Sequence, residues 1–148
     1  MHEIRFGIIG CGLMAHEFTS AVLRWPHLLD SGVRPRIVAI ADSKPSCHRW
    51  FQDNVPDLRL VTNDYRELLA DPKIDAMYCA VPHHAHAQIY SDIIAAGKHL
   101  LGEKPFGIDL AANEQILAAL RQRPDVFARC SSEFPFWPGP YQITRYLA

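Results

Sequence analysis

Several features that mark other classes of protein are missing from this sequence of 148 residues. No stretch approaches the roughly 18 apolar residues of a membrane-spanning helix. The short apolar run at the start is broken by two glycines and a His-Glu pair, unlike a signal peptide. The 15 basic and 16 acidic residues are well mixed, so no basic stripe offers a surface for nucleic acid. We therefore expect a soluble, cytoplasmic protein with neither a membrane nor a nucleic acid as its partner.

The chain also lacks the cysteine spacing of a metal site or a disulfide scaffold. Its cysteines are far apart and none forms a CxxC pair. Most of them fall in apolar runs, where a free thiol behaves as a small hydrophobic side chain. The four are Cys11, Cys47, Cys79 and Cys130. We expect buried structural thiols, in preference to disulfides or metal ligands.

A regular alternation of short apolar runs and longer amphipathic stretches is present instead. It is typical of βαβ units and a parallel sheet, and 49% hydrophobic against 21% charged residues is an ordinary globular balance. The expected strands are 4–9, 36–41, 58–61, 74–81, 99–101 and 126–130. The expected helices are 14–25, 45–54, from 63 or 64 to 71, 85–96, 109–121 and one near Tyr141. The pattern predicts an α/β Rossmann domain over residues 1–148, doubly wound, with a mostly parallel six-stranded sheet and helices on both faces.

Polar residues and a glycine mark several expected helix ends. Asn63 or Asp64, and likewise Asp109, stand where side-chain oxygens can accept hydrogen bonds from free helix N–H groups. Ser43 is placed to do the same for the helix expected over 45–54. Gly97 follows a predicted helix where a left-handed residue commonly ends one.

The first predicted strand runs directly into a glycine-rich turn. Residues 10–15 read GCGLMA, a GxGxxA pattern between a strand and a helix. Gly10 permits the tight turn, and Gly12 has no side chain to keep the backbone from a pyrophosphate. Leu13 and Met14 open a helix whose N–H groups and dipole attract phosphate. We expect these four residues to bind a dinucleotide; the alternative is an ordinary βα turn that happens to use glycine.

An acidic residue ends the second predicted strand. Asp42 is placed to accept hydrogen bonds from the adenosine ribose hydroxyls of NAD, and its charge would repel the 2′-phosphate of NADP. NAD is therefore the expected cofactor. NADP stays possible, since Ser43 and Lys44 stand where a phosphate could be met. The alternative role for Asp42 is that of a helix cap.

A charged pair follows the fifth predicted strand. Glu103, Lys104 and Pro105 lie at the carboxyl edge, where open α/β sheets bind their ligands. A lysine near a nicotinamide can hydrogen-bond a substrate oxygen and help move its proton, so we expect Lys104 to be catalytic and Glu103 to lie at the cofactor. A solvated Glu-Lys pair on a loop is an equal alternative.

Histidines cluster after the fourth predicted strand. Pro82, His83 and His86 are expected at a helix N-terminus, facing the cofactor. His84 and His86 suggest a metal site as an alternative, but no acidic or cysteine ligand is near in sequence, so we expect no metal.

These segments together resemble the amino-terminal half of the Gfo/Idh/MocA oxidoreductases. The resemblance is carried by GIIGCGLMA, ADSKP, LLADPKIDAMYCAVPHHAHAQI, AAGKHLLGEKPFGIDL and FPFWP, and EKP is its most specific part. It implies a cofactor domain for hydride transfer between NAD(P) and a hydroxyl of a sugar, polyol or related diol. Lys104 matches the family lysine at the substrate and nicotinamide ribose, and Glu103 the residue beside it. Pro82 and His86 match a P-x-x-x-H pattern at the cofactor edge.

The sequence departs from the family in two positions and in length. Val81 stands where the family usually has threonine, and Pro135 where it often has arginine. The resemblance implies a second α/β domain with the remaining acid–base group, which these 148 residues do not include. We expect this chain alone to bind cofactor with little or no turnover, and a full-length protein to be a possible homo-oligomer. The alternative function is a non-catalytic dinucleotide-sensing or protein-interaction module.

Overall fold

A six-stranded, all-parallel sheet forms the centre of the protein. The computed structural model describes residues 1–29, 31–132 and 134–147. The strands are β1 (His2–Ile9), β2 (Val33–Ala41), β3 (Leu60–Thr62), β4 (Ala76–Cys79), β5 (His99–Glu103) and β6 (Ala128–Ser131). Their order, β3-β2-β1-β4-β5-β6, is that of a complete dinucleotide-binding Rossmann sheet. The predicted fold class is confirmed.

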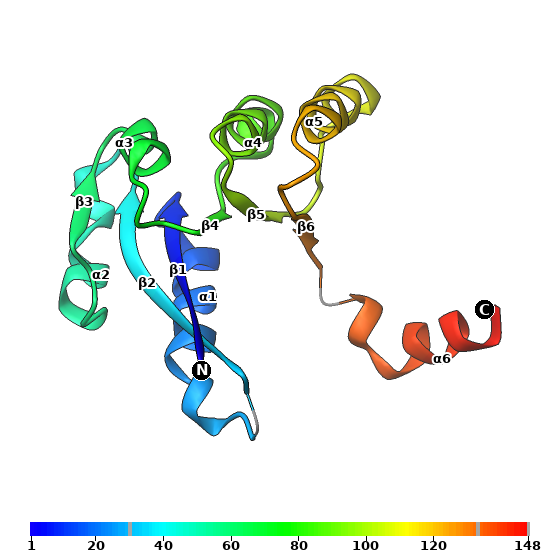
Figure 1. Cartoon of the computed structure of the whole chain (residues 1–148), viewed down its shortest axis with the longest axis horizontal. Helices are drawn as coiled ribbons and strands as arrows, with labels where there is room; N and C mark the ends of the chain where they lie inside the picture. Colours follow the sequence, from blue (N-terminus) through cyan, green and yellow to red (C-terminus); the bar gives the residue numbers. More distant parts are fainter. Residues whose placement is uncertain (30, 133, 148) are drawn as a thin grey trace.

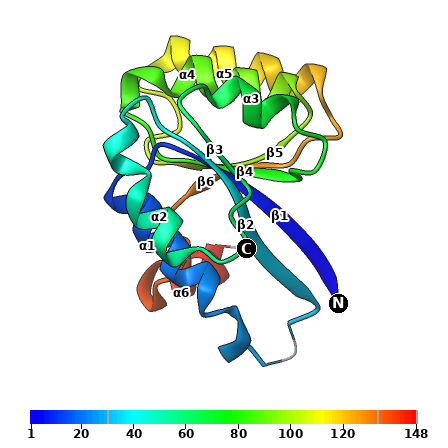
Figure 2. The same ribbon diagram turned by 90° about the vertical axis from the view of Figure 1, so that its left-hand side faces the viewer.

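The described residues form six α-helices, five of which cover the two faces of the sheet (Figure 1). They are α1 (Leu13–Leu23), α2 (Arg49–Asn54), α3 (Tyr65–Ala70), α4 (His86–Ala95), α5 (Leu110–Gln122) and α6 (Pro138–Leu147). Figures 1 and 2 show α3, α4 and α5 on one face and α1 and α2 on the other. Short 3-10 turns are η1 (Trp25–His27), η2 (Pro45–Cys47), η3 (His83–Ala85) and η4 (Phe134–Phe136).

Two hydrophobic layers hold the helices to the sheet, as parallel strands buried on both faces require. One layer, between the sheet and α3 to α5, includes Met77, Ile93 and Ile116. The other, toward α1 and α2, includes Ile8 and Phe51. All five side chains are fully buried. The strands therefore have little freedom to shift, and the loops at their carboxyl ends are well positioned.

Three of the residues predicted at helix ends are confirmed in that role. Asp64 accepts a hydrogen bond from the Arg66 N–H at the start of α3, and Asp109 accepts one from the Ala112 N–H at the start of α5. Gly97 follows α4 with a φ of +77°, the left-handed conformation that favours glycine.

The helix expected over 45–54 is instead divided. The turn η2 comes first, and α2 begins only after His48; neither has a side-chain cap, so Ser43 caps no helix here. Asp42 closes the turn in place of Ser43, and its Oδ1 accepts from the Lys44 N–H at 2.8 Å. The helix expected at 85–96 likewise starts as η3 and becomes α4 at His86.

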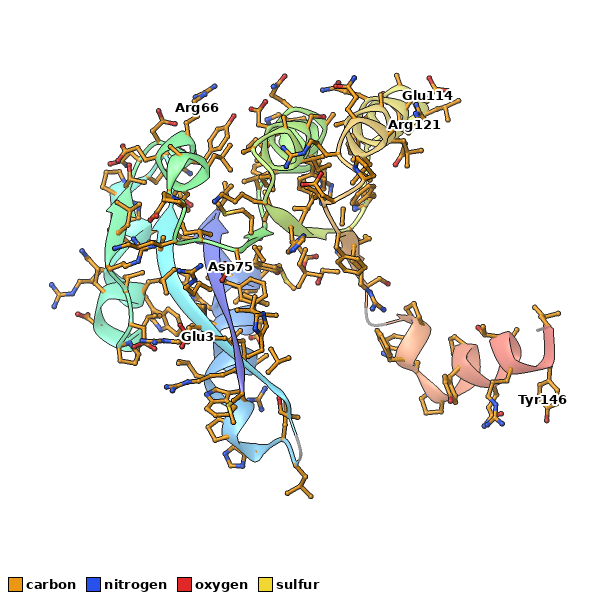
Figure 3. All side chains as sticks on the ribbon, viewed as in Figure 1. Glu3, Arg66, Asp75, Glu114, Arg121 and Tyr146 are labelled. Atoms are coloured by element: carbon orange, nitrogen blue, oxygen red, sulfur yellow. The ribbon has the colours of Figure 1, made fainter. Side chains whose placement is uncertain are left out.

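The last helix, α6, is separated from the sheet. No residue of α6 is buried, and Figure 1 shows the helix beyond the β6 edge. Tyr146 projects away from the domain (Figure 3) and is 88% exposed. None of the helices in the described part of the chain has the length and apolar character needed to span a membrane.

An ion pair at the amino-terminal end of β4, away from the carboxyl ends of the strands, allows a test of the packing of β1 against β4. Asp75 accepts hydrogen bonds from the Arg5 main-chain nitrogen at 2.8 Å, from Nε at 2.9 Å and from Nη2 at 2.7 Å. These hydrogen bonds lower the pKa of the Asp75 carboxyl. Its stabilisation is therefore present above the unfolded value of about 3.9, and is lost as pH falls through the lower folded value.

We expect Asp75→Asn to lower the melting temperature by a few degrees at pH 7, because the neutral amide cannot replace the charge-assisted bonds. The deficit should shrink as the pH is lowered through about 4 and below. Circular dichroism melts of both proteins between pH 7 and pH 3 measure this. A deficit that stays constant over this range would contradict the assignment.

Candidate functional site

A cleft of about 700 Å³ opens at the carboxyl ends of β1, β2 and β4. The strand order reverses between β1 and β4, which is where open α/β sheets bind ligands. The predicted site residues that line the cleft are Gly10, Gly12, Asp42, Ser43 and Pro82. Those outside its lining are Leu13, Met14, His83, His86, Glu103 and Lys104. Among the latter, Leu13 and Met14 open α1 directly beside the cleft.

Gly10 is required by the chain's own geometry. Its φ is +89°, and a Cβ at this position would lie 2.4 Å from the Ala80 carbonyl oxygen. Its N–H donates to the Ala41 carbonyl at 2.9 Å. Only glycine fits here, because β4 and β1 approach so closely at this turn.

Gly12 is different, since nothing in the protein requires it to be glycine. Its backbone is extended, with φ −82° and ψ −167°, which any residue can adopt. A Cβ there would have no atom within 4 Å. Gly12 is the N-cap of α1, which has neither a side-chain cap nor an acidic residue in its first turn. Among the described residues the Leu13 and Met14 N–H groups also have no acceptor. Open space beside free helix donors fits a phosphate group.

The Asp42 carboxylate holds the glycine turn and the loop after β2 together. Oδ2 accepts from the Cys11 N–H at 2.7 Å, and Oδ1 accepts from the Lys44 N–H at 2.8 Å. Each carboxylate oxygen has a second lone pair, so Asp42 can still accept two ligand hydroxyls. Burial, and then the Asp42 charge, raises the pKa of Cys11 to about 12. This thiol therefore stays neutral and packs as a small apolar group.

The start of α3 forms a wall of the cleft that sequence reasoning did not include. Asn63, Asp64 and Arg66 line it, as do Lys44 and Cys47 on the β2 side. Asn63 Nδ2 donates to the Asp42 carbonyl at 3.0 Å. Arg66 extends outward from α3 (Figure 3), with its guanidinium 4.9 Å from the Tyr65 ring centre. The signal was available, because α3 follows a parallel strand whose carboxyl end meets the same edge.

The histidines after β4 are placed differently from one another. His84 lines the cleft, whereas His83 is exposed outside it. His86 was expected to face the cofactor, but its ring is fully buried. Its two nitrogens face main-chain carbonyl oxygens, with Nδ1 2.8 Å from that of Pro105 and Nε2 3.0 Å from that of Val81. Within the described residues, no three His, Cys, Asp or Glu side chains gather closely enough to hold a metal ion.

Glu103 and Lys104 are not the solvated pair that sequence alone allowed. Glu103 is only 6% exposed, and its Oε1 accepts from the Tyr78 hydroxyl at 2.7 Å. Burial, and then this bond, raises the pKa of Tyr78. Lys104 is exposed and makes no ion pair with any described residue. The pair therefore separates into a buried carboxylate and an accessible amine at the end of β5.

Comparison with known proteins identifies this arrangement. Residues 4–129 match the family described as an oxidoreductase family with an NAD-binding Rossmann fold, GFO_IDH_MocA. The chain belongs to the Gfo/Idh/MocA family. The resemblance seen in the motifs is therefore confirmed over most of the sequence.

Two curated relatives illustrate the family. The chain is 34% identical over 120 residues to the uncharacterized oxidoreductase YrbE of Bacillus subtilis (strain 168), covering 81% of this chain and 33% of that protein. It is 29% identical over 145 residues to the trans-1,2-dihydrobenzene-1,2-diol dehydrogenase of Danio rerio, covering 98% of this chain and 41% of that one. The chain thus spans about a third to two fifths of the length of these relatives.

A solved structure shows the same fold. A levoglucosan dehydrogenase in complex with NADH and L-sorbose superposes with a TM-score of 0.85 at 24% identity. The match covers 99% of this chain and 39% of that one. Of the two departures from the Gfo/Idh/MocA pattern, Val81 lies in the cleft wall and Pro135 in the exposed turn η4.

Proposed function

We propose that this chain is the cofactor-binding part of an oxidoreductase that transfers hydride between NAD(P) and a hydroxyl group of a sugar, polyol or related diol. When bound, the nicotinamide supplies or accepts the hydride. The family membership and the Danio rerio diol dehydrogenase support the reaction class. We expect the chain by itself to bind cofactor with little or no turnover.

The single observation that carries the proposal is the open space at Gly12. A glycine in an extended conformation, with no protein atom near its missing Cβ, has no role in folding that another residue could not take. It lies directly beside the free N–H groups of α1. Clearance for a pyrophosphate explains both features.

Each predicted site residue then has a proposed role. Gly12, Leu13 and Met14 hold the pyrophosphate at the start of α1, after the turn that Gly10 permits. Asp42 and Ser43 lie at the adenosine ribose. The nicotinamide half extends the other way along the sheet edge, toward β4 and β5. There Pro82 and His83 flank it, and Glu103 and His86 act from beneath. Lys104 is the proposed catalytic residue, hydrogen-bonding the substrate hydroxyl and helping to move its proton.

We expect NAD⁺ and NADH to bind at least about tenfold more tightly than their 2′-phosphorylated counterparts, a difference of about 1.4 kcal/mol. Asp42 cannot turn away from a 2′-phosphate without losing the Cys11 and Lys44 N–H groups. Asp42→Asn removes the repulsive charge and should reduce the preference to less than about threefold. Calorimetric titration with NAD⁺, NADH, NADP⁺ and NADPH measures both proteins.

The titration has two outcomes that would contradict the proposal at different levels. Binding of none of the four dinucleotides by the wild-type chain would reject cofactor binding itself. Equal affinity for NAD⁺ and NADP⁺ in the wild type would reject only the role of Asp42 at the ribose. A circular dichroism melt of Asp42→Asn serves as the folding control.

A further inference from the structure

Two aromatic side chains on one face of α4 lie beneath the segment that carries Lys104. His86 and Tyr90 are four residues apart, which places them on the same side of the helix. Both are fully buried, and their rings stack with centres 4.6 Å apart and planes 23° apart. The cavity at the carboxyl edge does not reach either of them. They are therefore placed to act on the main chain above them and not on a ligand.

The His86 ring lies between two loops at the carboxyl edge of the sheet. Nδ1 lies 2.8 Å from the Pro105 carbonyl oxygen, and Nε2 lies 3.0 Å from that of Val81. Carbonyl oxygens only accept, so each contact is a hydrogen bond only when the ring nitrogen facing it carries a proton, and a neutral ring donates to one of the two. To hold Pro105, the ring needs the proton on Nδ1, at the shorter contact. Val81 lies in the cleft wall two residues after β4, and Pro105 directly follows Lys104.

Tyr90 holds the chain on the other side of Lys104. Its hydroxyl donates to the Glu103 carbonyl oxygen at 2.9 Å, and burial raises the pKa of Tyr90, so the hydroxyl keeps its proton. Gly102 makes the approach possible, because a Cβ at that position would lie 2.6 Å from the Tyr90 ring. The ring also packs against Phe106, with centres 5.6 Å apart.

The segment from Lys104 to Ile108 has few hydrogen bonds of its own, although Phe106 packs against the hydrophobic core. From Lys104 to Ile108, the described structure contains no hydrogen bond between two main-chain groups. The only described acceptor for the Lys104 N–H is the Glu103 carboxylate, at 3.3 Å. Apolar side chains at 86 and 90 would fill the same space but would leave the carbonyls of Glu103 and Pro105 without donors. The polar groups of these two rings therefore supply the donors for the carbonyls on either side of Lys104.

We propose that His86 and Tyr90 form a clamp that positions Lys104, and with it the nicotinamide half of the cofactor site, by holding the carbonyl groups on either side of the lysine. The inference deepens the proposed function and rests on it. In this role His86 and Tyr90 are positioning residues that touch neither cofactor nor substrate.

Two substitutions at one position separate the two tethers of His86. The amide nitrogen of asparagine takes a place close to that of Nδ1, and the amide nitrogen of glutamine one close to that of Nε2. His86→Asn should therefore keep the Pro105 tether and lose that to Val81, whereas His86→Gln should do the reverse. Binding is measured with NADH and with ADP-ribose, which lacks the nicotinamide. Backbone ¹⁵N order parameters of Lys104 and Phe106 give a readout that needs no ligand.

We expect His86→Gln to weaken NADH binding about tenfold, with ADP-ribose affinity unchanged within about twofold. The order parameters of Lys104 and Phe106 should fall in this variant. His86→Asn should resemble the wild type in both measurements. Tyr90→Phe keeps the ring but removes the donor to Glu103, and should act in the same direction as His86→Gln.

The outcomes separate the clamp from the proposed function. Glutamine and asparagine variants that behave alike, in affinity and in order parameters, would show that His86 only fills space and would overturn the clamp. If the wild type binds neither ligand, the proposed function fails, and the order parameters alone then decide on the clamp. If neither His86 variant folds, unchanged NADH affinity and order parameters in Tyr90→Phe would overturn it.

Discussion

Gly12→Asp is expected to weaken NADH binding by at least about 100-fold, or about 2.7 kcal/mol, while the protein stays folded. The new carboxylate would enter the space that we assign to the pyrophosphate. As an N-cap side chain it would also occupy the Met14 N–H group that a phosphate needs, and its charge would repel the ligand. NADH fluorescence titration measures the affinity.

Folding should survive this change for reasons visible at the position itself. Gly12 has an extended backbone and no neighbour within 4 Å of its missing Cβ. Aspartate is moreover a favoured N-cap residue, so α1 gains a cap that it now lacks. The melting temperature should therefore be unchanged or slightly raised.

Gly32 provides a matched control. It also has nothing within 4 Å of a Cβ, and it lies just before β2, at the opposite end of that strand from the cleft. Gly32→Asp adds the same charge to the protein and should bind NADH like the wild type. Equal NADH affinity in the Gly12 and Gly32 variants would remove the main support for the proposed function.

Gly10→Ala is expected to destabilise the fold by about 2–4 kcal/mol, the combined cost of a left-handed alanine and of overpacking. At φ +89° its Cβ would lie 2.4 Å from the Ala80 carbonyl oxygen. That carbonyl cannot withdraw easily, because the Ala80 N–H donates to Ile9 at 2.9 Å and holds this residue to β1. Urea unfolding of the variant and of the wild type measures the difference.

The same substitution at Gly32, where there is space, is the comparison for Gly10→Ala and should cost less than about 1 kcal/mol. A urea midpoint for Gly10→Ala equal to that of Gly32→Ala would mean that the turn can relax away from β4. Gly10 and Gly12 would then differ less in their tolerance of a side chain than their surroundings indicate.

Local chemistry made much of the fold predictable. Continuous apolar runs between amphipathic stretches indicated buried parallel strands and the helices between them. The described structure has six strands separated by helices along the chain. Asp64, Asp109 and Gly97 could be assigned as helix ends because a cap depends on neighbours within a few residues. The role expected of Ser43 fell to Asp42, which closes the turn at Lys44 and also accepts from Cys11, a residue in another part of the chain.

The site, like the fold, has features that could be predicted from the sequence and others that only the tertiary structure decided. The sequence by itself determined the family, the glycine turn and the acid after β2, because these depend on residue type and on short spacing. The motif already gave Gly10 and Gly12 different roles, but only the tertiary structure showed that a Cβ would clash at Gly10 and meet open space at Gly12. The tertiary structure also buried Glu103 and His86 beneath the sheet edge, where their partners come from the neighbouring strand β4 and from other loops. Spacing along the chain predicts which groups reach an edge, but burial and bonding depend on which strands become neighbours.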